Sequence, residues 1–325
     1  MPRLLFLLAR GFAFGTMALG CGGGAPGAKA IADPSTAASG DTIGADHDAD
    51  LAGAQGRTEE LTDATSLERL KERLAHGSLS GVRLNLAARS FGPGLGDVLA
   101  GAATLEGVVA LDVSDNGLGP DGVKALAASP HLAALRQLDL GGNDIDDRGV
   151  AELGSSGRFS ALKVLNLSGN GIGLDGVRAL AASPLLEGVR SLDLSMNPIG
   201  PEGARALAAS PHLAHLHSLF LLGCDIGATG AAALAGARGV RGLAVLALSG
   251  NGVGDSGARS LADAATLGSL ETLDVSANGI ADEGARALAA SPHLARVRSL
   301  EVFGNDFGPA GADALKQRFG SALKL

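Results

Sequence analysis

Three glycine patterns in the sequence have the residue types that bind dinucleotides. The pattern G-x-G-x-x-G occurs at residues 117–122, 171–176 and 252–257, each time after an expected strand and before an expected helix. Such glycines let a backbone approach a pyrophosphate at a helix N-terminus, and Asp193 stands where a ribose-binding carboxylate would follow the second pattern. However, the glycines recur because a longer unit recurs, and its strands are too short for a doubly wound sheet. We therefore expect no nucleotide cofactor.

Histidine side chains are the other groups that could do chemistry. His212, His215 and His217 lie within six residues, a spacing that could bind a metal ion. His131 and His293 occupy the same position of the recurring unit as His212. This recurrence favours a structural or exposed imidazole. Since no Ser/His/Asp set or catalytic carboxylate pair stands out either, we expect no enzyme activity, no metal and no other cofactor.

A unit of 27 residues repeats along most of the chain without insertion. Each unit contains an L-x-L triplet, which is typical of a short strand with both leucines pointing inward. An Ala-rich, helix-favouring stretch follows, and Ser-Pro ends it in four units because proline disfavours a helical residue before it. A glycine near the start of this stretch, from Gly122 to Gly311, would let neighbouring helices approach closely.

Asparagine fills one further position, the third residue after the triplet. Its amide can satisfy donors and acceptors of the backbone where the strand bends away. Cys224 occupies this position in one interior unit, where no charge is placed to activate it, and we expect a buried structural thiol. Arg89 occupies it in the first unit. The asparagines are Asn116, Asn143, Asn170, Asn197, Asn251, Asn278 and Asn305.

One such unit cannot bury its apolar face alone, so the units are expected to stack. Strands stack about 4.8 Å apart, whereas helices need about 10 Å. The stack should therefore curve, with short parallel strands on the concave face and helices on the convex face. The expected fold class is an α/β solenoid.

The unit resembles the leucine-rich repeat, specifically the ribonuclease-inhibitor-like subfamily with a helix in each turn. The resemblance covers residues 84–325 as nine repeats including the terminal cap, and residues 203–213 are similar to bacterial members. The period of 27 is slightly shorter than is usual in that subfamily. The resemblance implies a horseshoe and a non-enzymatic protein-binding scaffold. Some relatives activate small GTPases, so the alternative is a cytoplasmic GTPase-activating or regulatory protein with Arg89 as its arginine.

Residues 1–21 resemble a bacterial signal peptide that ends in a lipobox at Cys21. Ala18 stands where leucine is usual, and Arg10 interrupts the apolar stretch, so an ordinary signal peptide or a misassigned start codon are the alternatives. Residues 22–56 have the composition of a flexible tether. We expect a lipid-anchored envelope protein, with the outer membrane favoured over a secreted or cytoplasmic location.

Residues 57–83 are expected to form an N-terminal capping helix over the first repeat. Thr65 and Glu68 have the spacing of a capping box. Leu67, Leu70 and Leu74 then share one helical face, which can cover the core of the first unit.

The outward side chains of the strands form the surface that could bind a partner. The position between the two leucines is mostly acidic, and an apolar patch interrupts it. The acids are Asp112, Asp139, Asp193, Asp274 and Glu301, and the patch is Phe220, Leu222, Val245 and Ala247.

Each of these features has two interpretations. The acids serve solubility, or they attract a basic partner or a bridging cation. The patch anchors a partner, or it is a local deviation that packs against Cys224. With a net charge of −8 and no basic stripe, we expect a protein or peptide partner and no nucleic acid. Membrane contact should be through the lipid alone, and we expect a monomer.

Overall fold

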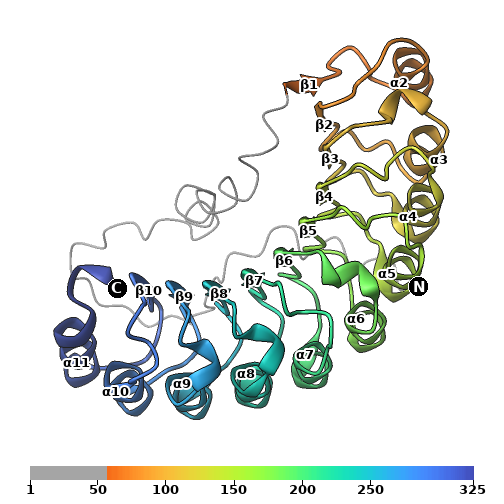
Figure 1. The fold of residues 1–325 in the computed structure, drawn as a ribbon. Coiled ribbons are helices and arrows are strands. Elements are labelled where there is room, and N and C mark those ends of the chain that lie inside the picture. Colours follow the sequence, from red (N-terminus) through yellow and green to blue (C-terminus); the bar gives the residue numbers. More distant parts are fainter. Residues whose placement is uncertain (1–56) are drawn as a thin grey trace, which may run out of the picture. The chain divides into compact units, whose positions relative to one another are not determined.

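The computed structural model describes residues 57–325, so the expected signal peptide with Cys21 and the expected tether lie outside the described residues. Within this part, eleven parallel strands form one sheet in the order of the sequence and alternate with ten α-helices. Figure 1 shows the strands along the inner side of this unit and the helices along its outer side. The predicted α/β solenoid is confirmed.

The elements are short and regular. The strands are β1 Thr58–Glu60, β2 Arg83–Asn85, β3 Ala110–Asp112, β4 Gln137–Asp139, β5 Val164–Asn166, β6 Ser191–Asp193, β7 Ser218–Phe220, β8 Val245–Ala247, β9 Thr272–Asp274, β10 Ser299–Glu301 and β11 Leu323–Lys324. The helices are α2 Leu67–Leu74, α3 Gly94–Ala100, α4 Gly119–Ala128, α5 Asp146–Ser155, α6 Leu174–Ala181, α7 Gly200–Ala208, α8 Gly227–Gly236, α9 Gly254–Ala262, α10 Asp282–Ala290 and α11 Pro309–Phe319.

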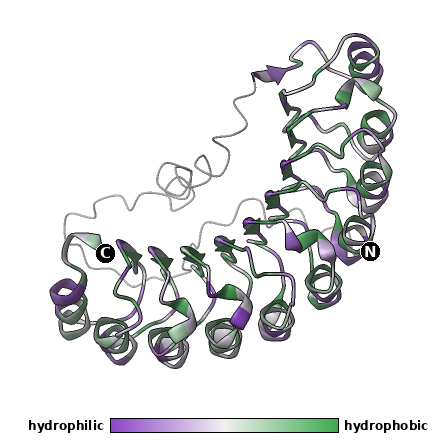
Figure 2. Cartoon of the chain, in the orientation of Figure 1, coloured by the Kyte–Doolittle hydropathy of each residue, from purple (hydrophilic) through white to green (hydrophobic). Residues whose placement is uncertain are grey.

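The core is one cluster of buried hydrophobic residues between the sheet and the helix layer. Figure 2 colours hydrophobic residues green and shows them along both the strands and the helices. Both leucines of the triplet contribute to it; Leu138 and Leu140 of the β4 turn are fully buried. The recurring glycines bring the helices together as expected. A Cβ on Gly149 of α5 would lie 3.1 Å from the Cα of Pro120 in α4. None of the helices in residues 57–325 combines the length and apolar character that a membrane span requires.

The buried asparagines connect neighbouring turns, as their position predicted. Asn143 is fully buried, and its Oδ1 accepts hydrogen bonds from the backbone N–H groups of Asn116 (3.0 Å) and Leu118 (3.2 Å) in the preceding turn. Its Nδ2 donates to three backbone carbonyls, those of Val113, Leu140 and Gly141. One amide therefore bonds five backbone groups, of which the three carbonyls also accept other hydrogen bonds.

Cys224 interrupts this asparagine ladder. Its Sγ lies 3.2 Å from the carbonyl oxygen of Leu194 and 3.5 Å from that of Leu222, and a thiol bonds such acceptors only weakly. The N–H of Ile199, whose equivalents in other turns donate to an asparagine, donates instead to the carbonyl of Asn197 at 2.8 Å. Burial raises the pKa of the Cys224 thiol to about 12. The expectation that Cys224 is buried is confirmed.

Replacing Cys224 with asparagine should raise the free energy of unfolding by about 1–2 kcal/mol, because the amide would supply hydrogen bonds that the thiol lacks. Urea denaturation followed by circular dichroism measures the change. The matched control is Asn170→Cys, which creates the same interruption two turns earlier and should lower stability. An unchanged or lower stability of Cys224→Asn would mean that the turn has adapted to the thiol.

Residues 57–83 contain more than the expected helix. Strand β1 pairs with β2 in parallel and begins the sheet, although its sequence Thr-Glu-Glu lacks the leucine triplet. The N-cap of α2 is Ser66, whose Oγ accepts from the N–H of Arg69, and not Thr65 as the capping-box spacing predicted. Leu70 and Leu74 are buried beneath the helix.

Candidate functional site

The side chains between the two leucines lie in one register across the concave face. Each strand pairs with the next so that these residues are direct neighbours, and we call this row the concave column. From β1 to β11 it consists of Glu60, Asn85, Asp112, Asp139, Asn166, Asp193, Phe220, Ala247, Asp274, Glu301 and Lys324. The five acids expected to meet a partner therefore share one row, in two groups on either side of Phe220 and Ala247.

The acids also have a structural role, which neither of the two interpretations from the sequence included. Oδ1 of Asp139 accepts the N–H of Gly141 at 2.9 Å, and Oδ1 of Asp193 accepts the N–H of Ser195 at 2.8 Å. The N–H two residues on has no ladder partner where the strand bends, and the side chain supplies one. Asn166 accepts the N–H of Ser168 at 2.9 Å in the same way. Because an amide performs this role equally well, the negative charges exceed what the turns need.

Burial affects the carboxylates of the concave column. Desolvation, assisted by the nearby charges of Asp112 and Asp193, raises the pKa of Asp139 from 3.8 to about 6, although hydrogen bonds from Gly141 and Asn166 oppose the shift. Burial also raises the pKa of Asp274, against the hydrogen bond from the backbone N–H of Ser276. Asp139, with a pKa of about 6, therefore holds negative charge at pH 7 in a position where water solvates it poorly.

The apolar patch is more buried than the sequence suggested. Phe220 and Val245 are each 4% exposed and Ala247 is 1% exposed, while Leu222 is partly exposed. Neighbouring strands are only about 4.8 Å apart, so side chains on the concave face cover one another. The prediction of a projecting aromatic anchor is corrected: Phe220 belongs to an apolar floor, and of the four patch residues Leu222 reaches the surface most.

Arg89 is engaged in the N-terminal part of the unit. Its Nη1 donates to the backbone carbonyls of Leu61 (2.7 Å) and Ala64 (3.3 Å), just before α2. The guanidinium thus takes the place of the amide found in later turns and fastens the first repeat to the segment that precedes it. Arg89 lies in the loop between β2 and α3, but its guanidinium is engaged with these carbonyls, whereas a GTPase-activating function would require it to reach a partner.

The histidines follow the repeat, as their spacing predicted. Nδ1 of His212 lies 3.0 Å from a carboxylate oxygen of Glu187 in the preceding turn, and His131 makes the same pair with Glu106 at 3.0 Å. Within residues 57–325, no group of three or more His, Cys, Asp or Glu side chains is arranged to hold a metal ion. The His212 imidazole thus contacts the preceding turn through its pairing with Glu187.

The glycine patterns are explained by backbone geometry. Gly117 and Gly119 have φ values of 66° and 60°, a left-handed conformation that glycine adopts without strain. Gly122 lies where a Cβ would be 3.0 Å from the carbonyl oxygen of Pro93 in the preceding turn. Turn geometry and helix packing therefore account for the three glycines.

A family model described as Leucine Rich repeat matches eight consecutive segments. They are residues 108–127, 131–154, 161–181, 189–208, 212–235, 243–262, 269–289 and 295–316, which together make up more than half of the chain. The chain belongs to the leucine-rich repeat family. It is thus a repeat scaffold, and no catalytic domain is shown. No curated protein matches the sequence.

Solved structures similar to this leucine-rich repeat protein are distant in sequence. A chain of the yeast Rad7–Elc1 complex has a TM-score of 0.53 and 16% identity, covering 81% of this chain and 68% of that chain. A Bacteroides fragilis protein has a TM-score of 0.49 and 16% identity, covering 71% and 69%. A chain of a TLR13–ssRNA13 complex has a TM-score of 0.46 and 18% identity, covering 83% of this chain and 39% of that chain. The similarity to the yeast chain shows a shared fold alone.

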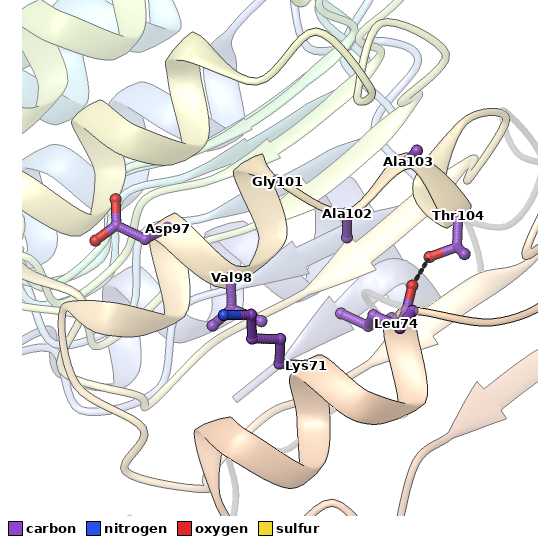
Figure 3. A pocket seen from close by; sticks show the side chains of 9 residues that line it. Lys71, Leu74, Asp97, Val98, Gly101, Ala102, Ala103 and Thr104 are labelled. Atoms are coloured by element: carbon purple, nitrogen blue, oxygen red, sulfur yellow. Dashed lines mark hydrogen bonds between the residues drawn. The ribbon is translucent and has the colours of Figure 1, made fainter.

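A recess of about 530 Å³ opens between α2 and α3 on the helix side (Figure 3). Leu74, Val98 and Ala102 supply apolar surface, and Lys71 and Asp97 contribute polar groups. The Oγ1 of Thr104 donates to the carbonyl of Leu74 at 2.6 Å and ties the end of α2 to the following turn. At the other end of the pair, a Cβ on Gly94 would meet Leu67 at 2.8 Å. The two helices are thus close at their N-terminal ends and separate towards the recess.

Replacing Val98 with leucine should leave stability unchanged or raise it by up to about 0.5 kcal/mol, because the added methylene enters the recess. The same change at Val150, which is fully buried in α5, should cost about 1–3 kcal/mol through overpacking. Thermal unfolding of both variants checks the difference. A similar loss at both positions would show that the recess closes in solution.

Proposed function

We propose that this leucine-rich repeat protein is a non-enzymatic scaffold that binds a protein or peptide, with a basic surface, on its concave face. The observation that carries the proposal is the charge of the concave column. Asn85 and Asn166 make the same turn-closing hydrogen bond as the aspartates, yet four turns use aspartate and a fifth uses Glu301. Charge that the fold does not need, held partly buried in one row, suits a cationic partner.

Within the proposed site, the acids and the patch have different roles. Asp112, Asp139, Asp193, Asp274 and Glu301 steer and orient the partner. Phe220, Val245 and Ala247 form an apolar floor, and the partly exposed Leu222 contacts the partner directly. In protein–protein interfaces, a few apolar residues surrounded by a polar rim often account for most of the binding affinity. Proteins of this repeat family commonly bind other proteins, which supports the same assignment.

The test removes charge without removing the turn-closing hydrogen bonds. In the triple variant Asp112→Asn, Asp139→Asn, Asp193→Asn, each amide can still accept the backbone N–H. We expect a partner crosslinked to the wild type in intact envelopes to be recovered about tenfold less with this variant. Leu222→Ser should weaken recovery independently. The matched control, Asp121→Asn, Asp175→Asn, Asp313→Asn, removes three exposed charges from helices. Equal recovery with both triple variants would contradict the proposal.

We also propose that the chain is a ribonuclease-inhibitor-like, bacterial member of the family, anchored at the cell envelope by a lipid on Cys21. The support is the lipobox-like sequence Ala18-Leu19-Gly20-Cys21 and the composition of residues 22–56. Cells given labelled palmitate should incorporate it into the wild type and not into Cys21→Ser. Absence of label in both would favour the secreted or cytoplasmic alternative and would leave the concave-face proposal to its own test.

A further inference from the structure

Met196 is the most exposed large hydrophobic side chain in residues 57–325, at 69% exposure. It lies just beyond β6, immediately before the asparagine of its turn. The other turns have only small or short side chains at this position: Ala88, Asp115, Gly142, Gly169, Gly223, Gly250, Ala277 and Gly304. Met196 is therefore a long apolar side chain at a position where the other repeats have small or short residues.

The backbone at this position disfavours a long side chain. Met196 has φ 58°, in the left-handed region, and every equivalent residue also has a positive φ. A residue other than glycine, asparagine or aspartate costs about 1–2 kcal/mol in this conformation. Since two-thirds of its surface remains in water, Met196 gains little from core packing to offset that strain. Strained residues of this kind are concentrated at functional sites.

The surroundings of Met196 are apolar and continuous with the patch. Its N–H donates to the carbonyl of Leu222 at 2.7 Å. Its Sδ lies close to Gly223: a Cβ added to Gly223 would be 2.9 Å from this sulfur. Phe220, two residues before Leu222, and Ala247, in register with Phe220, form the buried floor next to it. Met196 and Leu222 thus form an apolar contact surface at the edge of the concave face.

The charges around this contact surface define its occupant. Asp193 is in register with Phe220 on one side, and Asp225 is exposed one turn beyond Met196. From Asn85 to Asp274 the concave column contains no lysine or arginine, while Glu301 pairs with Lys324, the last residue of the column, at 2.7 Å. A partner must therefore bring an apolar side chain together with positive charge. In an extended peptide, alternate residues point to the same side, so the matching pattern is basic–x–apolar–x–basic.

We propose, building on the concave-face function above, that Met196 and Leu222 seat one large apolar side chain of an extended peptide segment, with lysine or arginine two residues to either side. Met196 is the residue that determines specificity for that apolar side chain. The carboxylates select the flanking basic residues.

The test uses a fluorescein-labelled peptide, Ser-Lys-Ser-Leu-Ser-Lys-Ser. The full-length protein is titrated into it, and binding is followed by fluorescence anisotropy. A second peptide has serine in place of leucine. We expect the leucine peptide to bind wild type about tenfold more tightly than the serine peptide, and Met196→Gly to remove that preference. Glycine suits the left-handed backbone, so this variant should fold at least as well as the wild type. Ala277→Gly, the same type of change three turns away, should keep the preference.

The outcomes separate this inference from the proposed function. If Met196→Gly retains the leucine preference, the role of Met196 is overturned, while loss of binding in the Asp112, Asp139, Asp193 triple variant would still support the acidic concave site. If both peptides bind wild type equally, the contact surface has no apolar specificity and the inference fails. If neither peptide binds, the inference fails, and crosslinking in envelopes still tests the concave face for a different partner.

Discussion

Replacing Asn143 with alanine is expected to lower the free energy of unfolding by more than about 3 kcal/mol. The side chain is fully buried and serves five backbone groups in two adjacent turns. Removing it takes the side-chain partner from all five, at a cost of about 1–3 kcal/mol for each group left unpaired before relaxation. The three carbonyls keep other hydrogen bonds, so the two N–H groups are the ones left unpaired. Because each turn of a solenoid is stabilised by its neighbours, the loss should weaken the contact between the β3 and β4 turns in particular. Urea denaturation followed by circular dichroism measures it.

The matched control for this prediction is Asn305→Ala, near the C-terminal end of the asparagine ladder. Asn305 makes equivalent bonds to Val275 and Val302, but it is only partly buried. Water can replace part of its hydrogen bonding there, so the loss should be clearly smaller than at Asn143. A loss below about 1 kcal/mol at Asn143 would contradict the view that the asparagine ladder holds the turns together.

The parts of the fold that the sequence predicted are those that depend on spacing alone. A constant period places Asp112 beside Asp139 and Asn116 beside Asn143, and the structure has these registers. The ends of the sheet were missed because β1 and β11 lack the leucine triplet. The role of Ser183 was missed too. Its Oγ donates to the carbonyl of Gly154 at 2.6 Å in the preceding turn, whereas the sequence attributed the helix end to proline alone.

For the proposed site, the sequence identified the outward-facing residues, and the structure shows how deeply each of them is buried. Alternation along a strand identifies the residues that point outward, but it does not say how far neighbouring strands cover them. Phe220 therefore looked exposed in the sequence and is 4% exposed in the structure. Met196 was missed because its position faces neither the core nor the concave column. The signal was present, however: a long side chain stands where other repeats have glycine, alanine or aspartate.

Replacing Asp139 with asparagine is expected to stabilise the protein at neutral pH and not in acid. Burial raises the pKa of Asp139 from 3.8 to about 6, so the folded protein holds a proton that the unfolded chain has released between those pH values. The contribution of the Asp139 carboxyl to the free energy of unfolding therefore falls as the pH rises from about 4 to about 6, and it stays low above that range. A rise of about two units in the pKa corresponds to a loss of at most about 3 kcal/mol in the free energy of unfolding. Solvent screens this partly exposed carboxyl, so the loss is smaller than that limit.

Asparagine at position 139 removes the buried charge, and its Oδ1 can still accept the N–H of Gly141. The hydrogen bond from Nδ2 of Asn166 to Oδ2 of Asp139 (3.1 Å) is lost, at a cost of about 1 kcal/mol that offsets part of the gain. Asp139→Asn should unfold at higher urea than the wild type at pH 7.5, and the two should converge near pH 3.5. Asn166→Asp provides the opposite control: it adds a carboxylate in register with Asp139 and should destabilise the protein more at pH 7.5 than at pH 3.5. A stability difference that does not change with pH would contradict the argument. If Asp139→Asn gains stability and also loses the crosslinked partner, the buried charge opposes folding and serves binding.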